Sequence, residues 1–225
     1  VGGAVAGNPA HAIVSSDGSI NTENSRIDIH ANAKPANSVG VNSIVVGYQN
    51  TTDDNDGTTA LGANNQAYGN SGLAVGNQNE SRGGASTAIG AGNRAAGAAT
   101  VAIGNVSNAN ARSAIAIGSY NNVDWTKGTW QTAPKNAGEY STVVGNYSSA
   151  TGTSSSGIYT NAAGPGSFAA GYSDNALGQN SVAIGSENTS HVADTITIGQ
   201  KNNAKTMGGI SIGKNNLTDS ADGNR

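Results

Sequence analysis

The stretch Ser181-Val-Ala-Ile-Gly185 decides the fold, because the chain repeats it with small changes over most of its length. Ser86-Thr-Ala-Ile-Gly90 and Thr100-Val-Ala-Ile-Gly104 are further copies. Eleven copies end at a glycine: Gly47, Gly62, Gly76, Gly90, Gly104, Gly118, Gly145, Gly171, Gly185, Gly199 and Gly213. Most neighbouring glycines in this series are 14 residues apart, which identifies a repeat protein with a 14-residue unit.

A second set of columns follows each of these glycines. Asparagine, serine or aspartate stands three residues after it, alanine often stands five after it and a second glycine seven after it, as in Asn93, Ala95 and Gly97. The residues before the glycine are small or β-branched and alternate with period 2, which predicts a strand. The glycine and the asparagine column tolerate positive φ, so we expect a turn there, followed by a second short strand at the alanine column.

Two strands and two turns fill one repeat and leave no room for a helix, so successive coils must stack in parallel. The sequence therefore predicts an all-β, parallel β-roll solenoid. Roughly 14 coils at about 4.8 Å each would make a rod about 65–70 Å long. The repeats occupy residues 43–216, and the apolar pairs near Ile13 and Ile27 suggest two weaker opening coils within residues 1–42. A degenerate copy at Gly157, with Ser154–Ser156 in place of the apolar strand, accounts for the longer interval between Gly145 and Gly171.

The alternation gives each long strand two faces. One face carries the Val/Ile positions, such as Ile115 and Ile117, and the other carries the intervening alanines, such as Ala116. We expect Val and Ile inside the coil and alanine on a flat outer face, although the reverse assignment fits the alternation equally well. On the first assignment Ile117→Asp disrupts its coil, whereas Asn121→Ala costs much less because only a turn preference is lost.

The composition predicts self-association. Each coil offers about two branched side chains, on the order of 3–6 kcal/mol of burial, and ordering the backbone of a whole coil costs more than that. A smooth alanine face left in water would add to the deficit, so we expect the rolls to associate with one another.

Composition also excludes several classes of protein. The chain has no cysteine, which rules out thiol catalysis and cysteine-ligated metals. A net charge of −3 and a pI near 5.5 do not fit nucleic-acid binding. No apolar run is long enough to span a bilayer, and no signal-peptide pattern stands at the start. The histidines His11, His30 and His191 are far apart in coil number, and Asp53–Gly57 fits a solvated turn better than a calcium loop. We therefore expect no catalytic residues, no metal and no cofactor.

The Ser-Val-Ala-Ile-Gly core, the later Asn, Ala and Gly columns and the 14-residue period resemble the YadA-like head domain of trimeric autotransporter adhesins. The resemblance covers about Ser43–Asn216. It implies a left-handed roll, a homotrimer packed about a threefold axis, and export to the surface of a Gram-negative bacterium. It also implies binding of extracellular matrix, host cells or other bacteria. Residues 217–225 read as the start of a connection to a neck and stalk, and only a C-terminal anchor outside this sequence would contact the membrane.

The insertion at residues 123–135 is the sequence's best candidate for a binding site. It contains both tryptophans of the protein and two cations: Trp125, Lys127, Trp130 and Lys135. Insertions in solenoids form loops on one face, and Trp is favoured in binding hot spots. The alternative is that the tryptophans pack locally against the roll or a neighbouring subunit.

Two other functions stay open. The chain could be a structural spacer of a surface fibre, with binding elsewhere, or an ice- or carbohydrate-binding solenoid. The last would show a regular Thr or aromatic ladder, and only Thr195-Ile-Thr197 has that pattern. The partner that we expect for an adhesin head is a protein or glycan ligand on a host or bacterial surface.

Overall fold

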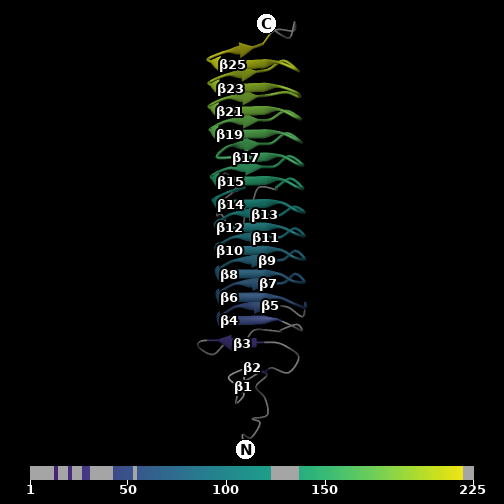
Figure 1. Cartoon of the computed structure of the whole chain (residues 1–225), viewed down its shortest axis with the longest axis vertical. Coiled ribbons are helices and arrows are strands. Elements are labelled where there is room, and N and C mark those ends of the chain that lie inside the picture. The colour runs from purple at the N-terminus through teal and green to yellow at the C-terminus, as the bar shows by residue number, and fades with distance from the viewer. Residues whose placement is uncertain are drawn as a thin grey trace, which may run out of the picture.

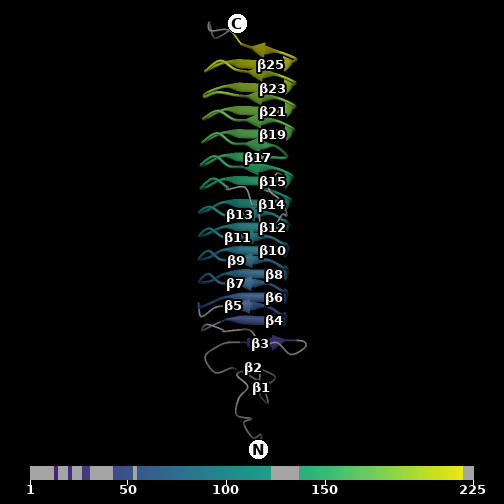
Figure 2. The same cartoon turned by 180° about the vertical axis from the view of Figure 1, so that it is seen from behind.

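The computed structural model is a straight rod of stacked strands that runs from β3 at one end to β25 at the other (Figures 1 and 2). It describes residues 43–52, 55–122 and 137–219, and three short strands before them: β1 (Ile13–Val14), β2 (Ile20–Asn21) and β3 (Ile27–His30). Strands and turns build this described part of the chain, which contains no helix and therefore no helix that could cross a membrane. The predicted all-β class is confirmed.

The long strands of successive coils form one parallel, 13-stranded sheet. Most neighbouring strands pair with an offset of one repeat, as Val101 does with Ile115. After β3, its strands are β4 (Ile44–Tyr48), β6 (Thr59–Ala63), β8 (Leu73–Asn77), β10 (Thr87–Ala91), β12 (Val101–Asn105), β14 (Ile115–Ser119), β15 (Thr142–Asn146), β17 (Ser156–Ile158), β19 (Phe168–Tyr172), β21 (Val182–Ser186), β23 (Ile196–Gln200) and β25 (Ile210–Lys214). The predicted parallel solenoid and its period are confirmed.

The short strands are two residues long and form two further parallel sheets. The five-stranded sheet contains β5 (Thr51–Thr52), β7 (Gln66–Ala67), β9 (Glu80–Ser81), β11 (Arg94–Ala95) and β13 (Asn108–Ala109). The six-stranded sheet contains β16 (Ser149–Ala150), β18 (Asn161–Ala162), β20 (Asn175–Ala176), β22 (Thr189–Ser190), β24 (Asn203–Ala204) and β26 (Leu217–Thr218). The predicted insertion separates them in sequence.

At the N-terminal edge, β3 joins the long sheet beside β4 in parallel. The pair β1 and β2 is antiparallel and forms a separate two-stranded sheet, so Ile13–Val14 does not have the pairing of a coil. The domain limits at residues 42 and 217 remain predictions.

The glycine that ends each long strand has a backbone that other residues rarely adopt. For the eight glycines Gly62, Gly76, Gly90, Gly104, Gly118, Gly185, Gly199 and Gly213, φ lies between +114° and +129°. In most coils a Cβ at this position would lie well inside 3.0 Å of the carbonyl oxygen of the corresponding glycine in the next coil. Both the left-handed φ and the close stacking of coils therefore require glycine here.

The assignment of the two strand faces favoured above is wrong. The alanines two residues before the turn glycine, such as Ala102 and Ala116, are fully buried inside the coil. Ile117 and Ile212, one residue before the glycine, are 38% and 62% exposed on the outer face. A two-residue strand joined by tight turns to a five-residue strand leaves a narrow interior, which small residues fill. Among the largest fully buried side chains of the described residues, Val143 is the only apolar one.

The role predicted for the asparagine column is also wrong. Positive φ falls one residue earlier, at Gln78 and its equivalents, while Asn79 is buried. Asn79 Nδ2 donates to the Val75 carbonyl (2.9 Å), the Gly90 carbonyl (2.7 Å) and Asn65 Oδ1 (3.0 Å), and Asn79 Oδ1 accepts the backbone N–H of Asn93 (3.1 Å). Asn121 is likewise fully buried and hydrogen-bonded, so Asn121→Ala removes a buried network rather than a turn preference.

The degenerate coil has a different register from the predicted one. Gly157 pairs with Val143 and Ala169, so it occupies the buried alanine column and not the turn. Tyr159, with φ +58°, stands at the turn instead. The strand Ser156–Ile158 is followed closely by β18, so the first turn of this coil is shorter than usual. Sequence alone misplaced this shortening because Gly157 imitates a turn glycine.

Candidate functional site

The four predicted binding residues, Trp125, Lys127, Trp130 and Lys135, lie outside the described residues. Their role therefore stays a prediction. The described residues that flank the insertion show where it leaves and re-enters the roll.

The insertion is anchored among the short strands. Asn122 Nδ2 donates to the Asn108 carbonyl (2.8 Å), and Asn122 Oδ1 accepts the backbone N–H of Ala150 (3.0 Å). On the returning side, the Ala137 backbone N–H donates to Asn110 Oδ1 (2.6 Å). Because β14 and β15 pair directly, the long sheet continues past the insertion, which interrupts only the short-strand side.

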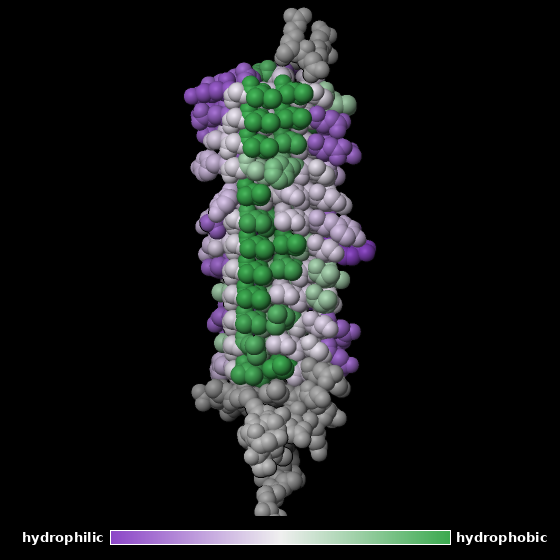
Figure 3. Space-filling model, in the orientation of Figure 1, coloured by the Kyte–Doolittle hydropathy of each residue, from purple (hydrophilic) through white to green (hydrophobic). Residues whose placement is uncertain are grey.

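An apolar stripe covers the outer face of the long strands along the whole rod (Figure 3). It consists of the residues one position before the turn together with the apolar residues three positions before it: Val46, Leu61, Val75, Ile89, Ile103, Ile117, Val144, Ile158, Ala170, Ile184, Ile198 and Ile212, with Ile44, Leu73, Val101, Ile115, Phe168, Val182, Ile196 and Ile210. These side chains are only partly buried in the single chain. A continuous exposed apolar surface of this kind is typical of an interaction interface.

A polar groove of about 420 Å³ runs beside the short strands β7, β9 and β11. It is lined by residues two positions after the turn glycines, which are Asn64, Gln78 and Gly92. Residues four positions after them also line it: Gln66, Glu80, Arg94 and Asn108. The buried asparagines Asn79 and Asn93 complete the lining, so most of it consists of amide groups and one ion pair.

The charged residues at the groove form ion pairs with one another. Glu80 pairs with Arg94 (Oε2 to Nε, 3.4 Å) and with Arg82 through its other oxygen. The Arg82 guanidinium carbon lies 5.8 Å from the centre of the Tyr68 ring, and Arg82 does not line the groove. Of these three charged residues, Arg94 contributes the cation that lines the groove.

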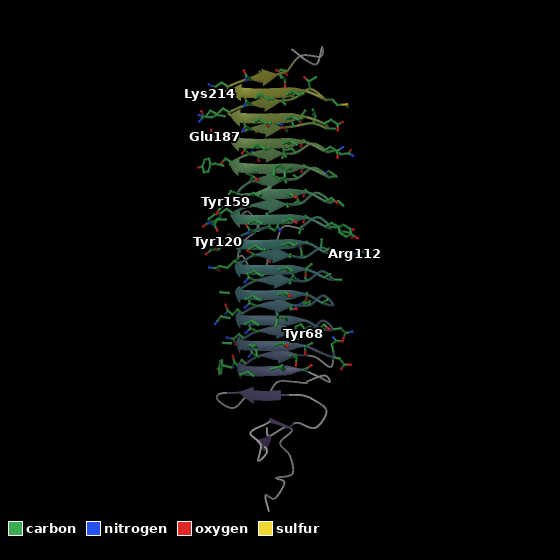
Figure 4. All side chains as sticks on the ribbon, viewed as in Figure 1. Tyr68, Arg112, Tyr120, Tyr159, Glu187 and Lys214 are labelled. Carbon is green, nitrogen blue, oxygen red and sulfur yellow. The ribbon has the colours of Figure 1, made fainter. Side chains whose placement is uncertain are left out.

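The two edges of the rod carry different side chains (Figure 4). Tyr120, Tyr159, Glu187 and Lys214 lie along the edge formed by the first turns, and Arg112 lies on the opposite edge. Tyr120 stacks on a tyrosine of the next coil, Tyr147, at 5.1 Å between ring centres. Tyr120 and Tyr147 therefore each cover one face of the other ring.

Metal ligands do not gather in the described residues, where no group of three His, Asp or Glu side chains could hold an ion. Asp53 and Asp54 of the predicted solvated turn lie outside the described residues, while Asp56 and Gly57 form a turn. His191 is exposed on the surface.

Asp174 is a buried acid within the asparagine column. Its Oδ1 accepts hydrogen bonds from the Asn188 backbone and side chain (both 2.8 Å), as an asparagine oxygen does in other coils. Its Oδ2 is buried and has no hydrogen-bond partner among the described residues. Where Asn79 and Asn202 place an N–H₂ that donates to two carbonyls, Asp174 offers an oxygen without a proton when it is ionised. Burial raises the pKa of Asp174 above the ordinary value, and the hydrogen bonds from Asn188 offset only part of the rise.

We expect Asp174→Asn to stabilise the roll at neutral pH by at least about 1 kcal/mol, because it restores the missing donor. The folded-state pKa of Asp174 is the higher one, so its contribution to stability is fully present below an unfolded pKa of about 4 and is lost as pH rises through the folded value. Melting temperatures of the two proteins measured from pH 4 to 8 should therefore diverge as pH rises. The reverse change, Asn202→Asp, should introduce the same dependence, and a difference that stays constant across this range would contradict the assignment.

Sequence reasoning missed the groove, although the signal was present. Among the described coils, Glu80 and Arg94 are the only charged residues four positions after the turn, and Gly92 is the only glycine two positions after it. These three residues depart from the repeat, and all of them stand within the segment from Glu80 to Arg94. Comparison of each coil with the consensus of the repeat therefore identifies this segment.

The comparisons with known proteins agree with this architecture. The family model described as the YadA head domain repeat matches residues 38–65, 54–79, 137–156 and 156–188. No match was found among the curated proteins with which the sequence was compared.

Proposed function

We propose that this chain, which carries a YadA-like head domain of trimeric autotransporter adhesins, is a homotrimeric adhesin head on the surface of a Gram-negative bacterium. Three left-handed rolls pack their long-strand faces about a common axis. The head presents the short strands, the edges and the insertion to ligands on extracellular matrix, host cells or other bacteria.

The observation that carries this proposal is the apolar stripe. Burying one Val or Ile side chain contributes about 1.5–3 kcal/mol, and the stripe has one or two such residues in most coils. The interior of each coil holds mainly alanine, serine, threonine and asparagine, so the large apolar side chains can be buried only against another molecule. A second and third copy of the same chain match the stripe in length and in coil spacing.

The adhesive contacts belong to the remaining surface. We assign a share of them to the insertion with Trp125, Lys127, Trp130 and Lys135, because its anchors lie on the short-strand side, away from the stripe. Three copies on one rigid body raise the effective ligand concentration, so weak single contacts still hold a surface.

We expect the protein to sediment at three times its chain mass of 22.1 kDa and to show little or no helix by circular dichroism. Beads coated with the trimer should attach to at least one panel of immobilised matrix proteins, glycans or cells, and uncoated beads should not. A folded monomer at micromolar concentration would contradict the trimer. A trimer that attaches to none of these surfaces would support the alternative function, a structural spacer.

A further inference from the structure

We propose that the polar groove beside β7, β9 and β11 is a binding site for an acidic saccharide, a sugar that carries a carboxylate. The inference rests on the proposed adhesive function and specifies its ligand class. It depends on described residues only and is independent of the Trp-containing insertion.

The groove exists because the repeat is broken locally. The position of Gly92 carries a side chain in the neighbouring coils, Gln78 and Val106. Gly92 has φ +65°, close to the +56° of both neighbours, so the backbone follows the repeat while the side chain is missing. Gly92 and Arg94 of the same coil both line the groove, so the missing side chain leaves room in the groove beside Arg94.

The charged pair four residues after the turn glycines, Glu80 and Arg94, is the second departure. The equivalent positions in the coils before and after hold the neutral residues Gln66 and Asn108, which pair in register with Glu80 and Arg94. Glu80 engages Nε of Arg94 at 3.4 Å. The contact is made at Nε, and the Arg94 side chain lines the groove with 31% of its surface exposed. Glu80 therefore orients Arg94 through Nε, and we assign the terminal N–H groups of Arg94 to the ligand.

The chemistry of the lining selects the ligand. A guanidinium fork matches a carboxylate with two parallel hydrogen bonds. The amides of Asn64, Gln66 and Gln78 can both donate and accept, which suits hydroxyl groups. The lining contains neither aromatic nor aliphatic side chains, so it lacks the pockets that peptide side chains or a lipid would fill. A volume of about 420 Å³ lies within the range of small-ligand sites.

The site is compatible with the proposed trimer, because it lies among the short strands and first turns and not on the apolar stripe. A homotrimer would carry three such grooves on one body. Weak binding at each groove would then become strong attachment to a surface dense in acidic sugars.

Titration of the intact protein with sialylated and uronic-acid oligosaccharides, followed by heteronuclear NMR or calorimetry, tests the proposal. We expect binding of these sugars and at least tenfold weaker binding of their neutral counterparts. Arg94→Gln should weaken binding at least tenfold. Gly92→Gln should do the same by filling the room beside Arg94, and Gln78 at the equivalent position shows that the fold accepts this residue. Arg112→Gln removes a cation on the opposite edge and should leave binding unchanged.

Melting temperatures close to that of the unsubstituted protein establish that the variants are folded. Equal binding of acidic and neutral sugars, or unchanged binding in both groove variants, would overturn the proposal, as would binding of sulfated sugars alone. Trimer-coated beads that attach equally well to cells stripped of acidic sugars would overturn the groove assignment and leave the adhesive function standing. Failure to attach to any surface would overturn the adhesive function itself.

Discussion

Ile117→Asp is expected to leave the roll folded and to abolish the trimer. The side chain is 38% exposed in the single chain, so the charge can stay in water and the cost to the isolated roll is about 1 kcal/mol or less. In the proposed trimer the same position lies within the apolar stripe, in register with Ile103 and Val144. Three aspartates would be buried there near the axis without partners, which costs several kcal/mol. Sedimentation should show a monomer with the circular dichroism spectrum of strands.

The matched control is the same substitution one residue earlier. Ala116 is fully buried inside the coil, so Ala116→Asp places an unpaired charge in the interior and should destabilise the roll by about 4 kcal/mol or more. Thermal melting of the two variants at one protein concentration separates the effects. If Ala116→Asp remained a folded trimer while Ile117→Asp failed to fold, Ile117 would lie inside the coil and Ala116 outside. The strand faces would then have the assignment first made from sequence.

The period of the repeat was the part of the fold that sequence could establish. A short repeat with two apolar segments and two glycines has room for strands and tight turns but not for a helix. This conclusion does not depend on which side chains are buried. The pairing of Ala88 with Ala102 and of Gly90 with Gly104 follows directly from that period. Parallel stacking follows as well, because each coil must begin where the last one ended.

The strand faces could not be established in this way, because alternation defines two faces and does not say which is inside. The decision depends on the width of the coil, which is a property of the turns. Tight turns that join a five-residue strand to a two-residue strand, as between β12 and β13, bring the two sheets too close for isoleucine, and alanine is left as the interior residue. The Val and Ile side chains of the apolar stripe are fully buried only in the homotrimer that we propose, and not within the single roll.

The asparagine column shows the same limit for polar residues. Asparagine at a turn suggests a left-handed φ, but in this fold the residue before the column adopts that φ, as Gln78 and Asn64 do, and the asparagine of the column supplies the buried hydrogen bonds. The sequence could not separate these roles, since both place asparagine beside a turn. The groove escaped notice for a related reason: its lining comes from four coils, and the departures at Glu80, Gly92 and Arg94 stand out only when these coils are compared with one another. The Trp-containing insertion has no repeat to fix its place, so its role stays a prediction.

Gly185→Ala is expected to destabilise the roll by about 4 kcal/mol or more, a cost at the upper end of single substitutions. Gly185 has φ +129°, a region that alanine adopts only with strain of about 1–3 kcal/mol. Its Cβ would also overlap the carbonyl oxygen of Gly199 in the next coil. Relief of that overlap requires the two coils to separate, which breaks the backbone ladder between β21 and β23 on which the stack depends. Denaturant unfolding at fixed protein concentration measures the loss.

Gly208→Ala is the matched control, because it also replaces a glycine of positive φ. Gly208 has φ +72°, and a Cβ there would have no atom within 4 Å. Ala85 and Ala99 occupy the equivalent position in other coils with φ of +54° and +55°, so the repeat already accepts alanine there. The expected cost is about 1–2 kcal/mol, that of a single left-handed residue. Equal losses in the two variants would mean that φ alone requires the turn glycines. A much larger loss at Gly185 would mean that the close backbone contact between successive coils requires them.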